Sequence, residues 1–215
     1  MAQAQSFCAS DGQPRPVALL ERFINADCAA CWSDAATVRA GQGELAIDWI
    51  VPGSQGDDAP LSAAASRDAL QRLEALRTPA GMGSWHRKTR VSGARGALRV
   101  AHGMALGGYM GASIELKPVP ASARGKSWTS WLALVESLPA GTEGSPVPRN
   151  LVRNLLQSTW DGRKQLLNQE RRFFEARSMS LSEGVDPARV RMIGWVEDSR
   201  GRIVAAAQSR CAEGG

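Results

Sequence analysis

The sequence VALLERFINADCAACWSDA, residues 17–35, decides the fold prediction. Its first seven residues are mostly apolar and follow a polar, proline-containing segment, so they predict a buried strand. Residues 29–40, AACWSDAATVRA, contain neither Gly nor Pro and carry apolar side chains at helical spacing, which predicts a helix. Cys28 is therefore expected at the N-terminus of a helix, with Cys31 one turn further along.

The alternation of strand and helix continues after this stretch. Residues 44–53, ELAIDWIVPG, predict a second strand that ends at Pro-Gly, and residues 66–77, SRDALQRLEALR, predict an amphipathic helix. Residues 91–108 contain two glycine-punctuated stretches and predict a further strand or hairpin that completes a small sheet. The first part of the chain is thus predicted to be an α/β domain.

Short strands follow one another beyond residue 110. Residues 112–118, 127–137 and 150–157 each predict a strand, and residues 191–208 predict a hairpin with DSRG as its turn. Regularly spaced strands separated by turns are typical of a β-sandwich, here of six or seven strands.

The predicted fold class is therefore α/β plus β, with residues 1–110 as an N-terminal domain and residues 111–215 as a β-sandwich-like domain. The chain has 215 residues, of which 43% are hydrophobic and 22% charged, which is typical of a folded globular protein. No apolar stretch is long enough to span a bilayer. The net charge is +5, but the basic residues are scattered, so nucleic-acid binding is not predicted.

Four cysteines lie at positions 8, 28, 31 and 211, and an even number favours an oxidising compartment. Ala2-Gln3-Ala4 is similar to the end of a signal-peptidase site, so we interpret the chain as a nearly mature periplasmic or secreted protein whose signal peptide has been removed. Cys8 and Cys211 lie near opposite termini, which are often close together in compact chains. We expect these two cysteines to form a disulfide.

A strand that leads into Cys-x-x-Cys at a helix N-terminus is typical of a thioredoxin-like redox site. The helix end favours the thiolate of Cys28, which would attack, and Cys31 would resolve the mixed disulfide. A zinc site would need a second pair of ligands at similar spacing, which the sequence lacks. A thiol-disulfide oxidoreductase without a cofactor, acting on a thiol or disulfide of an unknown partner protein, is the first functional hypothesis.

At this point the chain resembles a known family. VALLERFINADCAACWSDA, the later AIDWIV, NLVRNLLQSTWDG and RIVAAAQ are similar to the secreted bacterial thioredoxin-like proteins grouped as domain of unknown function 1223. The resemblance implies a thioredoxin-like N-terminal domain and a β-rich C-terminal domain. It points to Cys28 and Cys31 as the functional residues and implies no particular substrate.

Several residues depart from the pattern of that family. Trp32 follows the second cysteine where the family has proline, and the proline that faces the cysteines in thioredoxins has no counterpart before GMALGG. Asp27 adds a negative charge beside Cys28, which opposes formation of its thiolate. Glu21 is either a buried proton acceptor for the pair or an ordinary surface glutamate.

His102 raises a second hypothesis, because an imidazole beside Cys28 and Cys31 would form a copper(I) site, with Met104 and Met110 as further soft sulfur. The alternative for His102 is a loop residue without a ligand role, and methionines are more often core residues than ligands. A third hypothesis is a non-catalytic secreted protein in which the Cys28–Cys31 disulfide is structural. The sequence leaves all three open.

Overall fold

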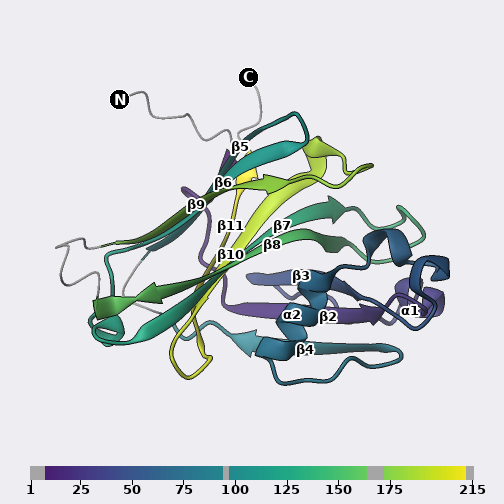
Figure 1. The fold of residues 1–215 in the computed structure, drawn as a ribbon, viewed down its shortest axis with the longest axis horizontal. Coiled ribbons are helices and arrows are strands. Elements are labelled where there is room, and N and C mark those ends of the chain that lie inside the picture. The colour runs from purple at the N-terminus through teal and green to yellow at the C-terminus, as the bar shows by residue number, and fades with distance from the viewer. Residues whose placement is uncertain (1–7, 94–96, 164–171, 212–215) are drawn as a thin grey trace.

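The structure is a computed structural model that describes residues 8–93, 97–163 and 172–211. The chain forms two β-sheets that face each other over part of their area, as Figure 1 shows. The strands are β1 (Cys8–Ala9), β2 (Ala18–Asn25), β3 (Glu44–Val51), β4 (Ser84–Arg90), β5 (Ala97–Leu106), β6 (Tyr109–Lys117), β7 (Ser127–Leu138), β8 (Arg149–Asp161), β9 (Phe173–Ser180), β10 (Val190–Glu197), β11 (Ile203–Gln208) and β12 (Arg210–Cys211). The α-helices are α1 (Ala29–Trp32) and α2 (Arg67–Ala75), accompanied by 3-10 turns η1 (Gly56–Asp58), η2 (Ser62–Ala64), η3 (Ala121–Ala123) and η4 (Pro187–Arg189).

The larger sheet has seven strands in the order β11-β10-β7-β8-β3-β2-β4. β2 and β3 are parallel, with Ala18 opposite Glu44 and Asn25 opposite Val51, and every residue of β2 is buried. A strand that is covered on both faces needs apolar residues in both orientations, which explains the mostly apolar run that opens residues 17–35. The cysteine motif therefore follows the end of an interior strand.

The smaller sheet has five strands in the order β12-β1-β5-β6-β9 and packs against one face of the larger sheet. Gly194 on β10 allows the sheets to approach closely, because a Cβ atom there would lie 2.5 Å from Cγ1 of Val100 and 2.9 Å from Cδ1 of Ile114. Large apolar side chains from both sheets fill the space between them; they include Val100, Ile114, Leu116, Trp128, Leu132, Leu134, Trp160, Phe173 and Val196.

The helices cover opposite faces of the larger sheet. α2 contributes Ala69 and Leu73 to a core that contains Phe23 and Trp49. The neighbouring residue of β2, Ile24, faces the other way, into a smaller core of Ile24, Ile50, Leu138 and Leu151 that Trp32 of α1 covers. Successive residues of a strand point to opposite faces, so β2 separates the side of α2 from the side of the cysteines.

The predicted thioredoxin-like α/β fold is wrong. The chain is mostly β-structure, and the helix predicted over residues 29–40 ends after one turn, at Trp32. Tertiary contacts compete with that helix, because two buried arginines bind its carbonyl groups. Arg149 donates a hydrogen bond to the carbonyl of Trp32 at 2.9 Å, and Arg22 donates one to the carbonyl of Val38 at 3.0 Å. The side chain of Asp34 accepts the N–H of Ala36 at 2.8 Å, which closes a turn instead of a helix.

Strands from both predicted domains share each of the two sheets. β3 is parallel to β8 in the larger sheet, and β5 pairs with β6 in the smaller one. The boundary expected at residue 110 falls inside β6 (Tyr109–Lys117). The sandwich predicted for residues 111–215 is therefore completed by strands from the N-terminal half, and β5, which was expected beside the first strands, lies in the other sheet.

Several local predictions are confirmed. β3 and α2 form within the predicted ranges 44–53 and 66–77, and β10 and β11 form the predicted hairpin. Gly201 has φ of 72°, the left-handed conformation that its turn requires. Ala2-Gln3-Ala4, interpreted as the remnant of a signal-peptidase site, lies outside the described residues.

Candidate functional site

Cys28 and Cys31 form a disulfide between the end of β2 and the single turn of α1, with their Cα atoms 5.3 Å apart. Both cysteines are partly exposed, and Ala29 and Ala30 between them are exposed. The N–H of Cys31 donates to Sγ of Cys28 at 3.2 Å. The pair is therefore accessible to another molecule, and one backbone donor is aimed at the first sulfur.

The short length of α1 changes the electrostatic argument for Cys28. A helix of one turn has a small dipole, so the stabilisation expected from a longer helix is largely lost. The hydrogen bond from the Cys31 N–H remains, and a donor to sulfur favours the thiolate over the thiol. Cys28 thus keeps one backbone donor to its sulfur.

A buried cluster of Arg22, Asp48 and Arg149 lies on the same side of the sheet. Asp48 accepts from Nη2 of Arg22 at 2.7 Å and from Nη1 of Arg149 at 3.1 Å, and the N–H of Asn150 donates to it at 2.8 Å. All three charged side chains are almost completely buried. Two guanidinium groups and one carboxylate give the cluster a formal charge of +1.

Arg149 connects this cluster to the residue after the cysteines. Its Cζ atom lies 4.9 Å from the centre of the Trp32 ring, and Nη2 donates to the Trp32 carbonyl. Burial lowers the pKa of Arg149, whereas the attraction of Asp48 raises it. The guanidinium keeps its positive charge, as it does throughout proteins. Nε1 of Trp32 donates to the carbonyl of Glu143 at 2.7 Å, so Trp32 is anchored on both sides.

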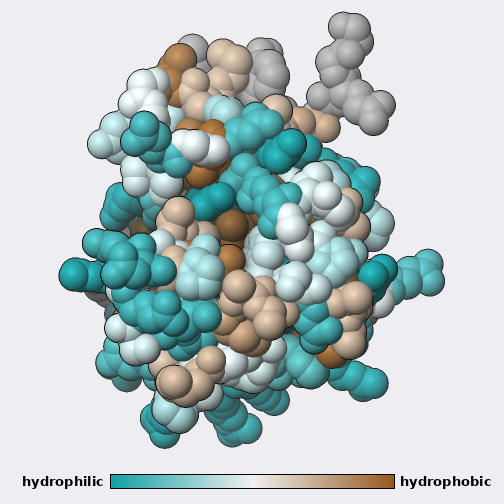
Figure 2. Space-filling model, turned by 90° about the vertical axis from the view of Figure 1, so that its right-hand side faces the viewer, coloured by the Kyte–Doolittle hydropathy of each residue, from teal (hydrophilic) through white to brown (hydrophobic). Residues whose placement is uncertain are grey.

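A cavity of about 200 Å³ opens beside Cys31. Its lining includes Arg22 and Arg149 together with Trp85 and His86 of β4. Figure 2 looks at the end of the molecule that carries α1 and shows a mostly hydrophilic surface with small apolar areas. The cavity beside the disulfide is thus lined by two arginines, the carboxylate of Asp34 and an aromatic side chain.

Asp27 lies directly before Cys28, and its carboxylate is held by the loop that follows β3. It accepts from the N–H and the hydroxyl of Ser54, each at 2.8 Å, and from the N–H of Gln55 at 3.3 Å. Gly53 leaves room for the carboxylate, which a Cβ atom there would contact. Desolvation raises the pKa of Asp27, but these hydrogen bonds outweigh it and lower the pKa below 3.8. Asp27 is therefore an ionised neighbour of Cys28.

Glu21 is buried, and it faces away from the cysteines. Its carboxylate accepts from Nε of Arg72 at 2.7 Å and from Nη2 at 3.0 Å, on the side of the sheet that α2 covers. Arg72 also pairs with Glu197 at 2.8 Å and lies over the rings of Trp131 and Trp195. Burial opposes the charge of Arg72, but Glu21 and Glu197 raise its pKa. The structure does not bring Glu21 to the disulfide.

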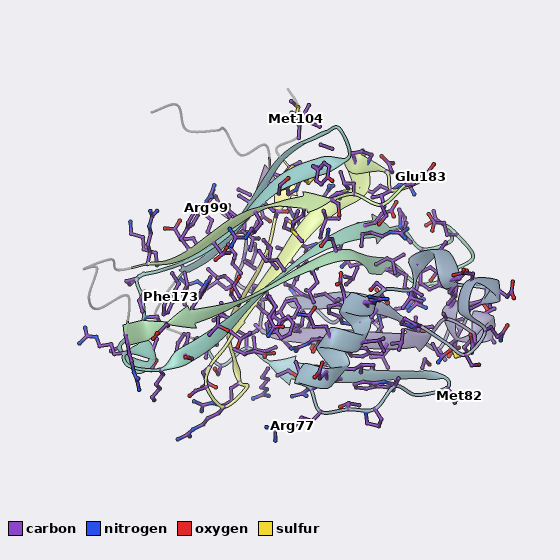
Figure 3. The ribbon with its side chains drawn as sticks, viewed as in Figure 1. Arg77, Met82, Arg99, Met104, Phe173 and Glu183 are labelled. Atoms are coloured by element: carbon purple, nitrogen blue, oxygen red, sulfur yellow. A yellow bond between two sulfur atoms is a disulfide. The ribbon has the colours of Figure 1, made fainter. Side chains whose placement is uncertain are left out.

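His102 is buried in β5, in the other sheet, and lies in register with Cys8. The predicted copper site of Cys28, Cys31 and His102 is therefore not assembled. Met104 of the same strand is 58% exposed, and Figure 3 shows it at the upper edge of the molecule, far from α1, whereas Met110 is a core residue. Desolvation lowers the pKa of His102, and the nearby positive charge of Arg191 lowers it further. The hydrogen bond to the carbonyl of Gly103 raises this pKa but does not outweigh the other two effects.

The predicted disulfide between Cys8 and Cys211 is confirmed. The two cysteines lie opposite each other in the antiparallel pair of β1 and β12, which joins the two ends of the described chain. Sequence reasoning missed the cluster of Arg22, Asp48 and Arg149. The available signal was the presence of Arg22 and Asp48 inside two apolar runs that predict buried strands, where a charge needs a partner.

No helix among the described residues is long and apolar enough to cross a membrane. No model of a known protein family matches the chain, and a search of curated proteins finds no significant match, so the resemblance to domain of unknown function 1223 stays a prediction. Among solved structures, the chain is similar to HBP35 of Porphyromonas gingivalis, with a TM-score of 0.55 and 11% identity over 92% of this chain and 76% of that chain. At this identity the similarity concerns the fold alone.

Proposed function

We propose that Cys28 and Cys31 form a reversible redox pair that exchanges electrons with thiols or disulfides of a partner protein. The observation that carries this proposal is the partial exposure of the pair at the end of a buried interior strand, beside a cavity that Cys31 lines. Thiol-disulfide exchange requires that an attacking sulfur reaches the disulfide, and a buried crosslink would prevent this.

The proposed reaction uses both sulfurs in sequence. In the reduced protein the thiolate of Cys28 attacks a partner disulfide, forms a mixed disulfide and releases one partner thiolate. The thiolate of Cys31 then attacks Sγ of Cys28, which forms the Cys28–Cys31 disulfide and releases the second partner thiolate. The partner disulfide gains two electrons and the pair loses two.

The charges around the pair act in opposite directions on its reduced form. The cluster of Arg22, Asp48 and Arg149 has a formal charge of +1, which favours thiolates nearby, and Asp34, which lines the same cavity, offsets part of this charge. The ionised carboxylate of Asp27 acts in the opposite direction on Cys28. We therefore expect a weakly oxidising pair. Replacement of Asp27 with Asn should lower the pKa of Cys28 and make the disulfide easier to reduce, whereas the exposed Asp57, replaced with Asn, serves as the matched control.

A structural disulfide is the second candidate. The residues on both sides of the pair are anchored to distant loops, Asp27 to Ser54 and Trp32 to Glu143, so a crosslink between them would fix the turn that joins these loops. In either case two disulfides in one chain fit an exported protein, and we propose a periplasmic or secreted location.

The reduction potential of the Cys28–Cys31 pair separates the two candidates. The protein is equilibrated with mixtures of reduced and oxidised glutathione, and the free thiols are alkylated and assigned by peptide mapping. A redox pair should equilibrate within the glutathione range, whereas structural disulfides have potentials below about −300 mV. Peptide mapping reports the Cys8–Cys211 disulfide of the same molecule separately. A Cys28–Cys31 pair that stays oxidised across the whole range would refute the redox proposal.

A further inference from the structure

Three side chains with soft or borderline ligand atoms meet at the end of the smaller sheet. β1 lies between β12 and β5, so that Cys8 is opposite Cys211 on one side and opposite His102 on the other. Residues directly opposite each other in antiparallel strands point to the same face. One ligand atom of each residue lies within 4.8 Å of the others.

The imidazole of His102 is already oriented for a ligand. Its Nδ1 lies 3.0 Å from the carbonyl oxygen of Gly103, and a carbonyl can only accept, so Nδ1 carries the proton. Nε2 therefore bears the lone pair, and it is a buried atom without a hydrogen-bond partner among the described residues. Buried polar atoms are normally paired. This tautomer, fixed by a backbone carbonyl, is common for metal-binding histidines.

We propose that Cys8, Cys211 and His102 bind one copper(I) ion when the disulfide between the two cysteines is reduced. Two thiolates and one imidazole form a soft set of three ligands, which suits copper(I). A structural zinc site normally has four protein ligands, and the group found among the described residues contains three. Cys8 and His102 are 3% and 4% exposed, so the ion would be largely shielded from water.

The step from disulfide to metal site balances with a dithiol as reductant. The Cys8–Cys211 bond takes up two electrons and two protons, and the dithiol becomes a disulfide. Each cysteine thiol then loses a proton as its sulfur binds the ion, and His102 contributes the lone pair of Nε2. Two thiolates and one copper(I) ion give a charge of −1, which the nearby positive charge of Arg191 partly offsets.

The test uses the full chain with Cys28 and Cys31 both replaced with Ser, so that one cysteine pair remains. The protein is reduced with dithiothreitol, freed of it by gel filtration without oxygen, and titrated with copper(I) in competition with a chromophoric chelator. We expect one equivalent to bind to the reduced form and none to the oxidised form. His102→Ala should weaken binding by about tenfold or more. His86→Ala, which changes the exposed second histidine, should bind like the parent protein.

Circular dichroism shows whether reduction alone unfolds the protein. Copper(I) should raise the melting temperature of the reduced parent protein, or refold it, and should have little effect on His102→Ala. The proposal is overturned if the reduced protein takes up no copper(I), if copper(I) neither stabilises nor refolds it, or if His102→Ala binds as tightly as the parent. Tighter binding of zinc(II) than of copper(I) would also overturn it. None of these outcomes depends on exchange at Cys28 and Cys31.

Discussion

The guanidinium of Arg149 lies over the ring of Trp32, and the distance from its Cζ atom to the ring centre is 4.9 Å. Arg149 also donates a hydrogen bond to the carbonyl of Trp32. One side chain from β8 thus holds both the ring and the backbone of the residue that follows the cysteine pair. Its other guanidinium nitrogens bind Asp48 and Ser145. The position of α1 on the sheet therefore depends on an arginine that is more than a hundred residues away in the sequence.

Replacement of Arg149 with Met should destabilise the protein by about 1.5 to 3 kcal/mol for each buried charged hydrogen bond that it removes, to Asp48 and to the carbonyl of Trp32, while Asp48 keeps its pair with Arg22. Urea unfolding measures this loss. Arg99→Met is the matched control, since Arg99 pairs with Asp11 at the surface and such pairs contribute about 1 kcal/mol or less. Equal losses in the two variants would show that Arg149 does not stabilise the fold through its buried contacts.

Replacement of Glu21 with Gln should reduce stability without changing the redox properties of the cysteines. The variant can keep one hydrogen bond from Arg72 to its amide oxygen, but it loses the other, worth about 1.5 to 3 kcal/mol, together with the negative charge. Because Glu21 faces α2 and not α1, the reduction potential of the Cys28–Cys31 pair should stay as in the parent protein. If the reduction potential of the pair shifts while the variant stays folded, Glu21 would instead act as a proton acceptor for the cysteines.

The two disulfides should contribute unequally to stability. In the chain-entropy model, a crosslink with a sequence separation of 203 stabilises by about 5 kcal/mol, and one with a separation of 3 by about 2 kcal/mol. Replacing both Cys8 and Cys211 with Ser should therefore lower the urea midpoint more than replacing both Cys28 and Cys31 with Ser. The opposite order would mean that the Cys28–Cys31 crosslink has the larger structural role.

The stabilising effect of Asp27 should depend on pH. Its pKa in the folded protein is below the ordinary value of 3.8, so its contribution is fully present above 3.8 and is lost as the pH falls through the folded pKa. The parent protein should be more stable than Asp27→Asn at neutral pH, and the difference should shrink below pH 3.8. Urea midpoints of both proteins across this range test the prediction, and Asp57→Asn, at an exposed position, is measured alongside as the control.

The sequence by itself determined the local elements. The mostly apolar run before Cys28 predicts an interior strand, the leucine spacing in residues 66–77 predicts α2, and DSRG predicts the turn between β10 and β11. These features follow from contacts between neighbours in the chain, so their periodicity and turn residues are visible in the sequence. The pairing of Cys8 with Cys211 was also predictable, because it required only that the termini lie close together.

Only the tertiary structure decided which distant residues meet. Arg22 and Asp48 are visible as charges within apolar runs, but their partner Arg149 comes from a strand about one hundred residues later, and its hold on Trp32 shortens the predicted helix. His102 reaches Cys8 and not Cys28, because β5 joins the smaller sheet. Strand order and register are set by packing between both halves of the chain. The energy of this long-range packing cannot be inferred from the local sequence pattern of either half.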